Sequence, residues 1–418
     1  MPRVLVVSDV FSPPQWGEPC RTHRFVSQLS HFGWEPQVLC LQQRPASSDT
    51  NHVVVHESLP WAKFQRVIFR GVSAFSAKSG SDDQSAAKPA AWYRGDSVEH
   101  FFLARKGLNL AKRHRFDLIY AAGQTPGIHL AAQWLARRIQ CPWVSDLSPA
   151  CALLNEAAEK AQKLYRWKND ILENQVLATS QRVLVHTQEF RNFLLQRFPK
   201  VPRAHVQVVP DCFEAVDVVE AAQDRTARPF HLFVHQNDWH YQSIKNFLGA
   251  LEKIFKKHPG WISEFLFYWY GHRPRDIETV LQRLNLMQSF QFLNEKPVSR
   301  AQEAAAASHV FVILQDEHHS QSVLDSYPLF QWIGYGKPIL GVGPKGAVRR
   351  LIRELKLGRD FSSAEMEGIA ATLTYWFVEF KNNALPMRNR RFSSFEPFEV
   401  TRQLASVFDF CLQRYETP

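Results

Sequence analysis

The chain has 418 residues, too many for one ordinary core, and this length predicts two or three domains. Hydrophobic residues make up 45% of the chain and charged residues 22%, which excludes the disordered and fibrous classes. The formal net charge of +10 favours anionic partners such as nucleotide phosphates or an acidic membrane face. Because the basic residues are spread along the chain, an ordinary solvated surface explains this charge equally well.

The six cysteines include no C-x-x-C pair and no histidine at zinc-finger spacing. Free thiols in a reducing compartment explain them, and we expect neither a metal nor a cofactor. The apolar run at the N-terminus is too short for a signal peptide, and no segment is apolar enough to predict a membrane-spanning helix. We therefore expect a cytoplasmic protein, with contact to the inner membrane face as an option.

Short apolar runs alternate with amphipathic helices along the first half of the chain. The run 4–7 predicts a strand buried on both faces, and Gly17 lies in the loop that follows it. A helix is predicted from about Arg21 to a stop at Gly33. Further strands are predicted at 37–41, 116–120, 142–145, 182–185 and 206–209, with helices at 127–138 and 156–178. The alternation predicts a mostly parallel, doubly wound sheet.

The same alternation restarts after a polar, Ala-rich stretch. Strands are predicted at 230–234, 265–270, 290–293, 310–314 and 338–342, with helices at 244–255 and 399–412. We therefore predict an α/β protein with a first domain at 1–215, a linker at 216–229, a second domain at 230–398, and a C-terminal helix at 399–418 that crosses back to the first domain.

Two segments do not fit the alternation. The stretch 73–91 is rich in Ser, Ala, Gly and Lys and predicts a mobile loop. The stretch 61–70 mixes aromatic residues with three basic ones and could lie on an anionic membrane. A plain strand or helix of the first domain is the favoured interpretation of 61–70.

Several motifs resemble family 4 glycosyltransferases, and the resemblance covers nearly the whole chain. The most specific one is Gln331-Trp332-Ile333-Gly334-Tyr335-Gly336-Lys337-Pro338-Ile339-Leu340, which keeps the family's spacing from a helix through a glycine to a strand. The other matching segments are the Pro-Pro, Gly-containing loop at 11–25, Gly33-Trp34-Glu35-Pro36, 117–120 with Pro126-Gly127, 142–146 and 206–214. The resemblance implies a GT-B fold, in which two Rossmann-like domains face each other across a cleft.

The resemblance also implies that the second domain holds a nucleotide-sugar donor and the first holds the acceptor. The family uses an Arg and a Lys after the first strand of the second domain to neutralise the donor diphosphate. Lys245 fits the lysine, although an exposed helix lysine is the alternative; no Arg is present, so His235 or Gln236 would replace it. The remaining predicted donor or phosphate contacts are Gly17, Gly343 and Asn294.

The catalytic motif departs from the family pattern. The family has two glutamates in a Glu-x7-Glu spacing, and Val323 and Gln331 stand at these positions. Gln331 can still hydrogen-bond a ribose hydroxyl, but it supplies no negative charge. His318, in the polar segment 316–320, is a candidate for a sugar or phosphate contact, with an exposed loop as the alternative. A metal there is not expected, since no third ligand is evident.

Arg21, Arg24 and Asp146 are the candidates in the first domain. The two arginines lie one helical turn apart and could share an anionic acceptor or the donor phosphate, while an ordinary polar helix face explains them equally well. Asp146, at the end of a predicted strand, is a catalytic or anchoring candidate or a helix N-cap.

The sequence therefore predicts a retaining, metal-independent glycosyltransferase. It would move a sugar, such as a hexose, from a nucleotide diphosphate to a saccharide or a lipid-linked acceptor in cell-surface glycan synthesis. A catalytically silent binding or partner protein is the alternative, because both carboxylates are missing. A sugar-nucleotide epimerase of the same fold is the third option. Nucleic acid is not expected, because no recognition module is present.

Overall fold

The structure is a computed structural model. It describes residues 1–11, 21–43, 54–57, 100–123, 125–149, 174–213, 229–236, 242–271, 273–274, 276–293, 297–315, 323–324, 326–386 and 392–416. The segments 61–70 and 73–91 and nearly all of the predicted linker lie outside these residues. Two compact units result: unit 1 is Met1–His186, Arg191–Pro210 and Pro397–Pro418, and unit 2 is Thr187–Phe190 and Asp211–Glu396.

Unit 1 is built on a parallel sheet of seven strands in the order β3-β2-β1-β4-β5-β6-β7. The strands are β1 (Arg3–Phe11), β2 (Glu35–Gln43), β3 (Val54–Glu57), β4 (Leu118–Gly123), β5 (Trp143–Leu147), β6 (Arg182–Val185) and β7 (Val206–Val208). The first apolar run is wholly buried, as a strand covered on both faces requires.

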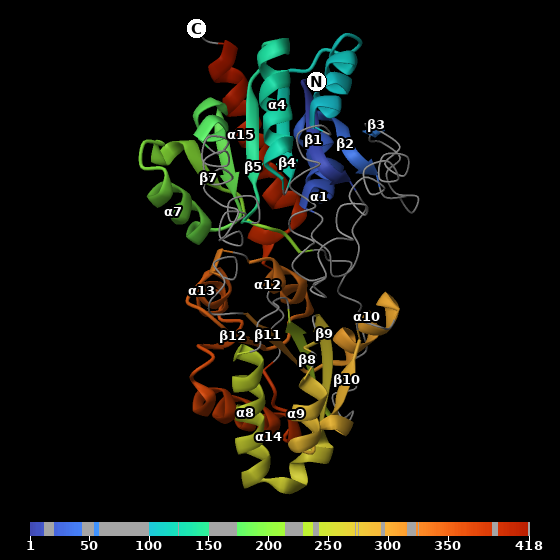
Figure 1. Cartoon of the computed structure of the whole chain (residues 1–418), viewed down its shortest axis with the longest axis vertical. Helices are drawn as coiled ribbons and strands as arrows, with labels where there is room; N and C mark the ends of the chain where they lie inside the picture. The colour runs from blue at the N-terminus through green and yellow to red at the C-terminus, as the bar shows by residue number, and fades with distance from the viewer. Residues whose placement is uncertain are drawn as a thin grey trace, which may run out of the picture. The chain divides into compact units, whose positions relative to one another are not determined.

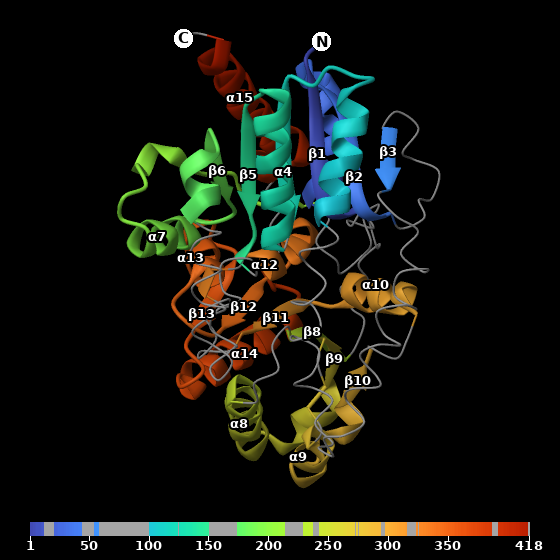
Figure 2. The same cartoon turned by 45° about the horizontal axis from the view of Figure 1, so that its top comes forward.

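Helices cover the sheet of unit 1 (Figures 1 and 2). The described helices are α1 (Arg21–Gln28), α4 (Pro126–Ile139), α7 (Gln188–Arg197) and α15 (Pro397–Glu416), with helical residues also at 100–111 and 174–179. The C-terminal helix α15 packs on α1, and the indole of Trp34 donates a hydrogen bond to Asp409 (2.9 Å) and packs its ring against Phe408. Helix 100–111 packs on α4, where Gly107 lies against Leu135.

Unit 2 is built on a parallel sheet of six strands in the order β10-β9-β8-β11-β12-β13. The strands are β8 (Phe230–Gln236), β9 (Phe265–Gly271), β10 (Phe290–Phe292), β11 (Val310–Leu314), β12 (Ile339–Val342) and β13 (Gly358–Phe361). The helices are α8 (Gln242–Lys257), α9 (Ile277–Arg283), α10 (Val298–Ala307), α12 (Tyr327–Trp332), α13 (Ala347–Glu354) and α14 (Met366–Lys381). Short 3-10 helices lie at Leu29–Phe32, Arg203–His205, Pro259–Glu264, Met287–Ser289, Ile333–Tyr335 and Ser393–Phe395.

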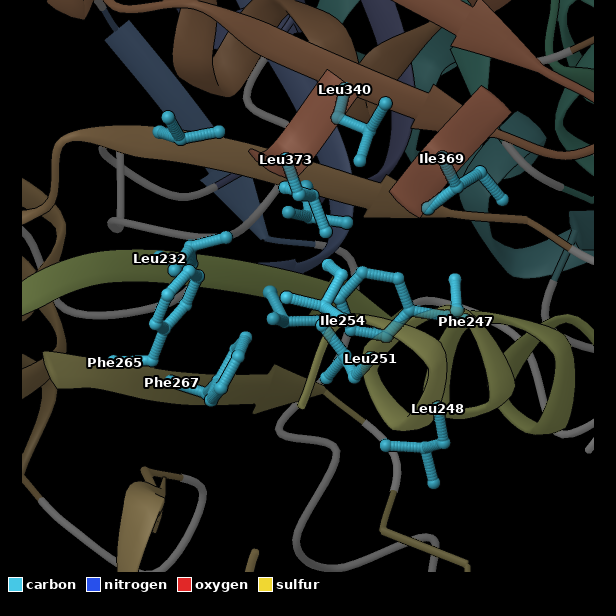
Figure 3. Packing of buried hydrophobic residues seen from close by; sticks show 14 of the residues in the cluster. Leu232, Phe247, Leu248, Leu251, Ile254, Phe265, Phe267, Leu340, Ile369 and Leu373 are labelled. Atoms are coloured by element: carbon cyan, nitrogen blue, oxygen red, sulfur yellow. The ribbon is translucent and has the colours of Figure 1, made fainter. Parts of the chain in front are cut away.

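The aromatic strand predicted at 265–270 forms part of the core of unit 2. In β9, Phe265, Phe267 and Trp269 are buried, while the residues between them are partly exposed. Figure 3 shows Phe265 and Phe267 next to each other on β9, and the ring of Phe267 packs edge-on against Phe247 of α8, with centroids 6.5 Å apart. Each fully buried side chain of this size contributes about 1.5–3 kcal/mol of hydrophobic free energy. Aromatic residues in this strand therefore stabilise the core.

The predicted fold class of two Rossmann-like α/β domains is confirmed. Both sheets are parallel, and each has the doubly wound order of a Rossmann fold, extended by one strand in unit 1. Gly33 and Gly336 end helical turns in the left-handed region, with φ of 82° and 65°. None of the described helices is long and apolar enough to cross a membrane.

Candidate functional site

Each sheet reverses its strand order beside its first strand. In unit 1 the reversal lies between β1 and β4, and in unit 2 it lies between β8 and β11. In α/β proteins, ligands bind at the carboxyl ends of the strands beside such a reversal. These two places are therefore the candidate sites.

The reversal in unit 1 brings Asp9 next to the turn between β4 and α4. One oxygen of the Asp9 carboxylate accepts a hydrogen bond from the Thr125 hydroxyl (2.6 Å) and the other accepts one from the Thr125 backbone N–H (3.3 Å). Gly123 permits this approach, because a Cβ there would lie 2.6 Å from Asp9 Oδ2. The carboxylate thus fixes the turn that starts α4.

His100 lies against the same turn. Its Nε2 is 3.4 Å from the Thr125 hydroxyl. Since that hydroxyl donates its proton to Asp9, it can only accept from His100, which assigns the imidazole proton to Nε2. Burial, followed by the nearby His129, lowers the pKa of His100 to about 4, so the ring is neutral. Gly127 is necessary here, because a Cβ would lie 1.9 Å from the ring.

Asp146 of β5 forms a buried ion pair with Arg21 of α1. Arg21 Nε donates to Asp146 Oδ2 (2.9 Å), and the Tyr120 hydroxyl donates to the same oxygen. Burial alone would raise the pKa of Asp146, but the Arg21 guanidinium, helped by His186, outweighs it and holds the pKa below its ordinary value.

The guanidinium of Arg21 also binds the backbone beyond β7. It donates to the carbonyl oxygens of Val209 (2.8 Å) and Pro210 (2.6 Å). The side chains of Arg21 and Asp146 are 10% and 1% exposed. In this conformation Arg21 and Asp146, both predicted as ligand contacts, therefore hold α1 to the sheet. Arg24 lies on the same helix and is half-buried, and acceptor binding by either arginine stays a prediction.

In unit 2, polar contacts fasten the start of α8 to the end of β11. The Ser243 hydroxyl donates to the carbonyl oxygen of Gln315 (2.6 Å). Gly343, which follows β12, lies beside the same residue, since a Cβ at Gly343 would be 2.8 Å from Gln315 Cβ. Gly343, a predicted donor contact, thus lies next to the reversal point of this sheet.

Lys245 occupies the first turn of α8, and its side chain is exposed. A helix of 16 residues carries a partial positive charge at its N-terminus, where backbone N–H groups lack partners within the helix. The lysine adds a full charge to this end. The first turn of α8 therefore carries positive charge.

His235, a predicted replacement for the family's arginine, packs against α12. The Trp332 indole donates to His235 Nδ1 (3.0 Å), and His235 is 4% exposed. Because Nδ1 accepts this bond, the neutral ring carries its proton on Nε2. His235 therefore lies in the packed layer beside Tyr270 rather than on the surface.

The position of the family's first glutamate lies against the start of α13. A Cβ at Gly346 would lie 2.6 Å from both Cα and the carbonyl oxygen of Val323. Gln331 belongs to α12, and its side chain is outside the description. Gly17, Asn294 and His318 also fall outside the described residues.

Sequence analysis did not identify Asp9, His100 and Thr125 as candidate site residues. The spacing Gly123-x-x-x-Gly127 around Thr125 was the available signal, because two glycines at the end of a strand permit close approach. In the part of the chain that the structure describes, no group of three or more His, Cys, Asp or Glu side chains is placed to hold a metal ion.

Comparison with known proteins agrees with this architecture. Residues 19–212 match the glycosyl transferase 4-like domain family. A search of curated protein sequences gives no match. Among solved structures, a glycosyltransferase from Rickettsia africae is similar at 11% identity, with a TM-score of 0.62 and 99% of both chains covered.

Two further structures are similar over nearly their whole length. A sucrose-phosphate synthase from Thermosynechococcus elongatus has 12% identity and a TM-score of 0.59, covering 99% of this chain and 97% of that one. HepE of Anabaena, solved in complex with UDP and glucose, has 14% identity and a TM-score of 0.58, covering 96% of this chain and 99% of that one. At such identities the likeness concerns the fold. The chain thus has the two-domain fold of these GT-B glycosyltransferases, and its residues 19–212 match the glycosyl transferase 4-like domain family.

Proposed function

We propose that the chain transfers a sugar, such as a hexose, from a nucleotide diphosphate to a saccharide or lipid-linked acceptor, with retention of configuration at the anomeric carbon. The observation that carries the proposal is Lys245 in the first turn of α8, at the reversal point of unit 2. In this reaction the bond from the sugar C1 to the diphosphate oxygen breaks, and the leaving diphosphate keeps the electron pair. The acceptor hydroxyl oxygen forms the new bond to C1 on the same face, and its proton passes to the leaving diphosphate. A lysine and a helix N-terminus stabilise the charge of the diphosphate without a metal.

The donor assignment is supported by the similar protein HepE, whose structure contains UDP and glucose. The full-length likeness to a sucrose-phosphate synthase supports sugar transfer in the same way. A lipid-linked acceptor in cell-surface glycan synthesis would place the protein at the cytoplasmic face of a membrane.

The test is binding of UDP- and GDP-sugars, with CMP-sugars, which carry a single phosphate, as the contrast, followed by measurement of released nucleotide. Lys245→Ala should weaken donor binding about tenfold or more, because a charge-assisted contact to phosphate is lost. Lys257→Ala, at the other end of α8, is the matched control and should leave binding unchanged. Equal affinities for both variants would refute the diphosphate assignment, and binding of no donor would refute the transferase.

A catalytically silent binding protein is the second candidate. Val323 and Gln331 stand where the family has two glutamates, so both carboxylates are missing. Donor binding without nucleotide release or transfer would favour this candidate. A gain of donor hydrolysis by Gln331→Glu would show that the position lies in the site. Conversion of the donor sugar to its epimer would point to an epimerase instead.

A further inference from the structure

Unit 1 carries a cluster of basic residues where two neighbouring helices end. The residues 112–115 follow helix 100–111 and lead into β4, and the end of α4 leads into β5. Because β4 and β5 are parallel neighbours, with Ile119 opposite Trp143, the two connections emerge at the same edge of the sheet. We call Lys112, Arg113, Arg115, Arg137 and Arg138 the basic edge.

The charge on this part of the surface is one-sided. The stretches 100–116 and 126–142 contain seven Lys and Arg residues and no Asp or Glu. All five residues of the basic edge are exposed. Arg115 lies 3.5 Å from Asp117, but the other four have no acidic partner among the described side chains. By contrast, Lys253 and Lys256 of α8 each pair with a glutamate.

The carbonyl groups at the end of α4 have hydrogen-bond donors other than the basic side chains. The side-chain amide of Gln140 donates to the carbonyl oxygen of Arg137 (2.7 Å). The backbone N–H of Cys141 donates to the carbonyl oxygen of Ala136 (3.2 Å). The last turn of α4 thus has other donors for its carbonyl groups. The guanidinium groups of Arg137 and Arg138 are therefore available to an external partner.

An aromatic side chain accompanies the charges. Trp134 lies one helical turn before Arg138, is 36% exposed, and lies 5.3 Å from the Arg138 guanidinium carbon. Tryptophan beside exposed lysine and arginine is typical of surfaces that meet lipid headgroups, because its ring is apolar and its N–H is polar. The cations attract anionic headgroups at the same time.

We propose that the basic edge, with Trp134, is a docking surface for an anionic lipid membrane. This surface lies at the amino ends of β4 and β5, whereas Asp9 and Thr125 lie at the carboxyl ends of β1 and β4, so the proposal goes beyond the proposed function and does not depend on it. The basic edge is a different surface from the segment 61–70, for which the sequence allows membrane contact as an alternative. A nucleic acid is the competing polyanion, but the sequence contains no recognition module for it.

The test is sedimentation of the full-length protein with phospholipid vesicles, without donor or acceptor. Vesicles that contain phosphatidylglycerol should bind the protein, vesicles of pure phosphatidylcholine should not, and binding should fall as salt is raised. Because no turnover is measured, failure of the transferase proposal leaves this result unaffected, and the reverse also holds.

A charge-matched pair of variants locates the surface. The quadruple variant Lys112→Gln, Arg113→Gln, Arg137→Gln and Arg138→Gln should lose vesicle binding more than about tenfold, since each cation near an anionic surface contributes about fivefold. The control variant Lys257→Gln, Arg283→Gln, Lys356→Gln and Arg359→Gln removes four exposed cations of unit 2 and should bind as the wild type does. Circular dichroism checks that both variants are folded.

Trp134→Ala should weaken vesicle binding while leaving its salt dependence unchanged, because the ring contributes apolar contact rather than charge. Equal losses in the two quadruple variants would overturn the proposal in favour of non-specific charge. Absence of binding to anionic vesicles, together with salt-sensitive binding of an RNA or DNA oligonucleotide that the first quadruple variant abolishes, would assign the basic edge to nucleic acid.

Discussion

Arg21 and Asp146 illustrate how a charged residue beside a ligand-binding loop can serve the fold. They are 125 positions apart, so no local pattern shows that the two side chains pair. In the structure the guanidinium bonds the carboxylate and two backbone carbonyl oxygens, and both side chains are buried. Sequence reasoning located the right strand end but could not separate a ligand contact from an internal ion pair.

Loss of this pair should destabilise the protein strongly. Arg21→Leu leaves the Asp146 carboxylate buried without its counter-ion and should lower the free energy of unfolding by about 3–5 kcal/mol. Arg24→Leu, on the same helix and partly exposed, should cost under about 1 kcal/mol. Urea denaturation measures both values. If Arg21→Leu kept wild-type stability but lost transfer to the acceptor, the ligand contact predicted from the sequence would be right.

Lys337, from the segment that resembles the family most specifically, also has a structural role. Its ammonium group donates to the carbonyl oxygens of Ala305 (3.1 Å) and Ala306 at the end of α10. Burial lowers the pKa of Lys337 to about 7. The motif thus places an amine beneath the end of α10, where its protonated form is favourably aligned with the helix dipole.

The pKa of Lys337 gives a prediction about pH. In the unfolded chain a lysine stays protonated up to about pH 10.4, so between about pH 7 and 10 the unfolded state binds more protons than the folded state. This group therefore makes stability rise with pH in that window, and its destabilising effect is complete below about pH 7. Lys337→Met should remove the rise. Denaturation of both proteins at about pH 6.5 and 9.5 tests this; a stability difference that does not change with pH would contradict it.

The turn between β4 and α4 is a packing unit that joins three segments of the chain. Asp9 fixes Thr125, and His100 fills the space that Gly127 leaves open. Gly127→Ala places a methyl group against the imidazole and should destabilise the protein by about 1–3 kcal/mol. Gly260→Ala is the control, because a Cβ there meets nothing within 4 Å.

A double-mutant cycle identifies the cause of that loss. If the collision with His100 is responsible, Gly127→Ala combined with His100→Ala should cost clearly less than the sum of the two single variants, since the two residues are in contact. Free energies of unfolding measure the coupling. Additive losses would show that the backbone of the turn, and not the imidazole, limits the substitution.

The central strands were predicted from their apolar runs, whereas the edge strands β3 and β13 and the apolar helix α14 were not predicted. The central strands β1, β8 and β11 are buried on both faces, so a continuous apolar run marks each of them. The edge strand β13 reads Gly-Arg-Asp-Phe and is partly exposed, so hydrophobic periodicity does not detect it. Its Asp360 forms a largely buried ion pair with Arg349 of α13, a contact that depends on tertiary structure. Edge strands and turns are therefore predicted less well than the core.

At the scale of the whole molecule, the two units share a strand order but differ in chemistry at the reversal point. Unit 1 presents a carboxylate and a neutral imidazole around Thr125, whereas unit 2 presents Lys245 at a helix N-terminus. A diphosphate is repelled by a carboxylate and attracted by a lysine. The division of roles between the units stays a prediction from the resemblance, and this difference in charge is consistent with it.

Donor binding should therefore stabilise the protein through unit 2. At a donor concentration of 100 times Kd, the linkage relation predicts about 2.7 kcal/mol of added stability. Amide hydrogen exchange with and without the bound nucleotide sugar should show added protection at the start of α8 and after β12, around Ser243 and Gly343. These segments lie at the reversal point, where a diphosphate would contact backbone N–H groups. Added protection that appeared only around Asp9 and Thr125 would place the donor in unit 1 and reverse the proposed roles of the two units.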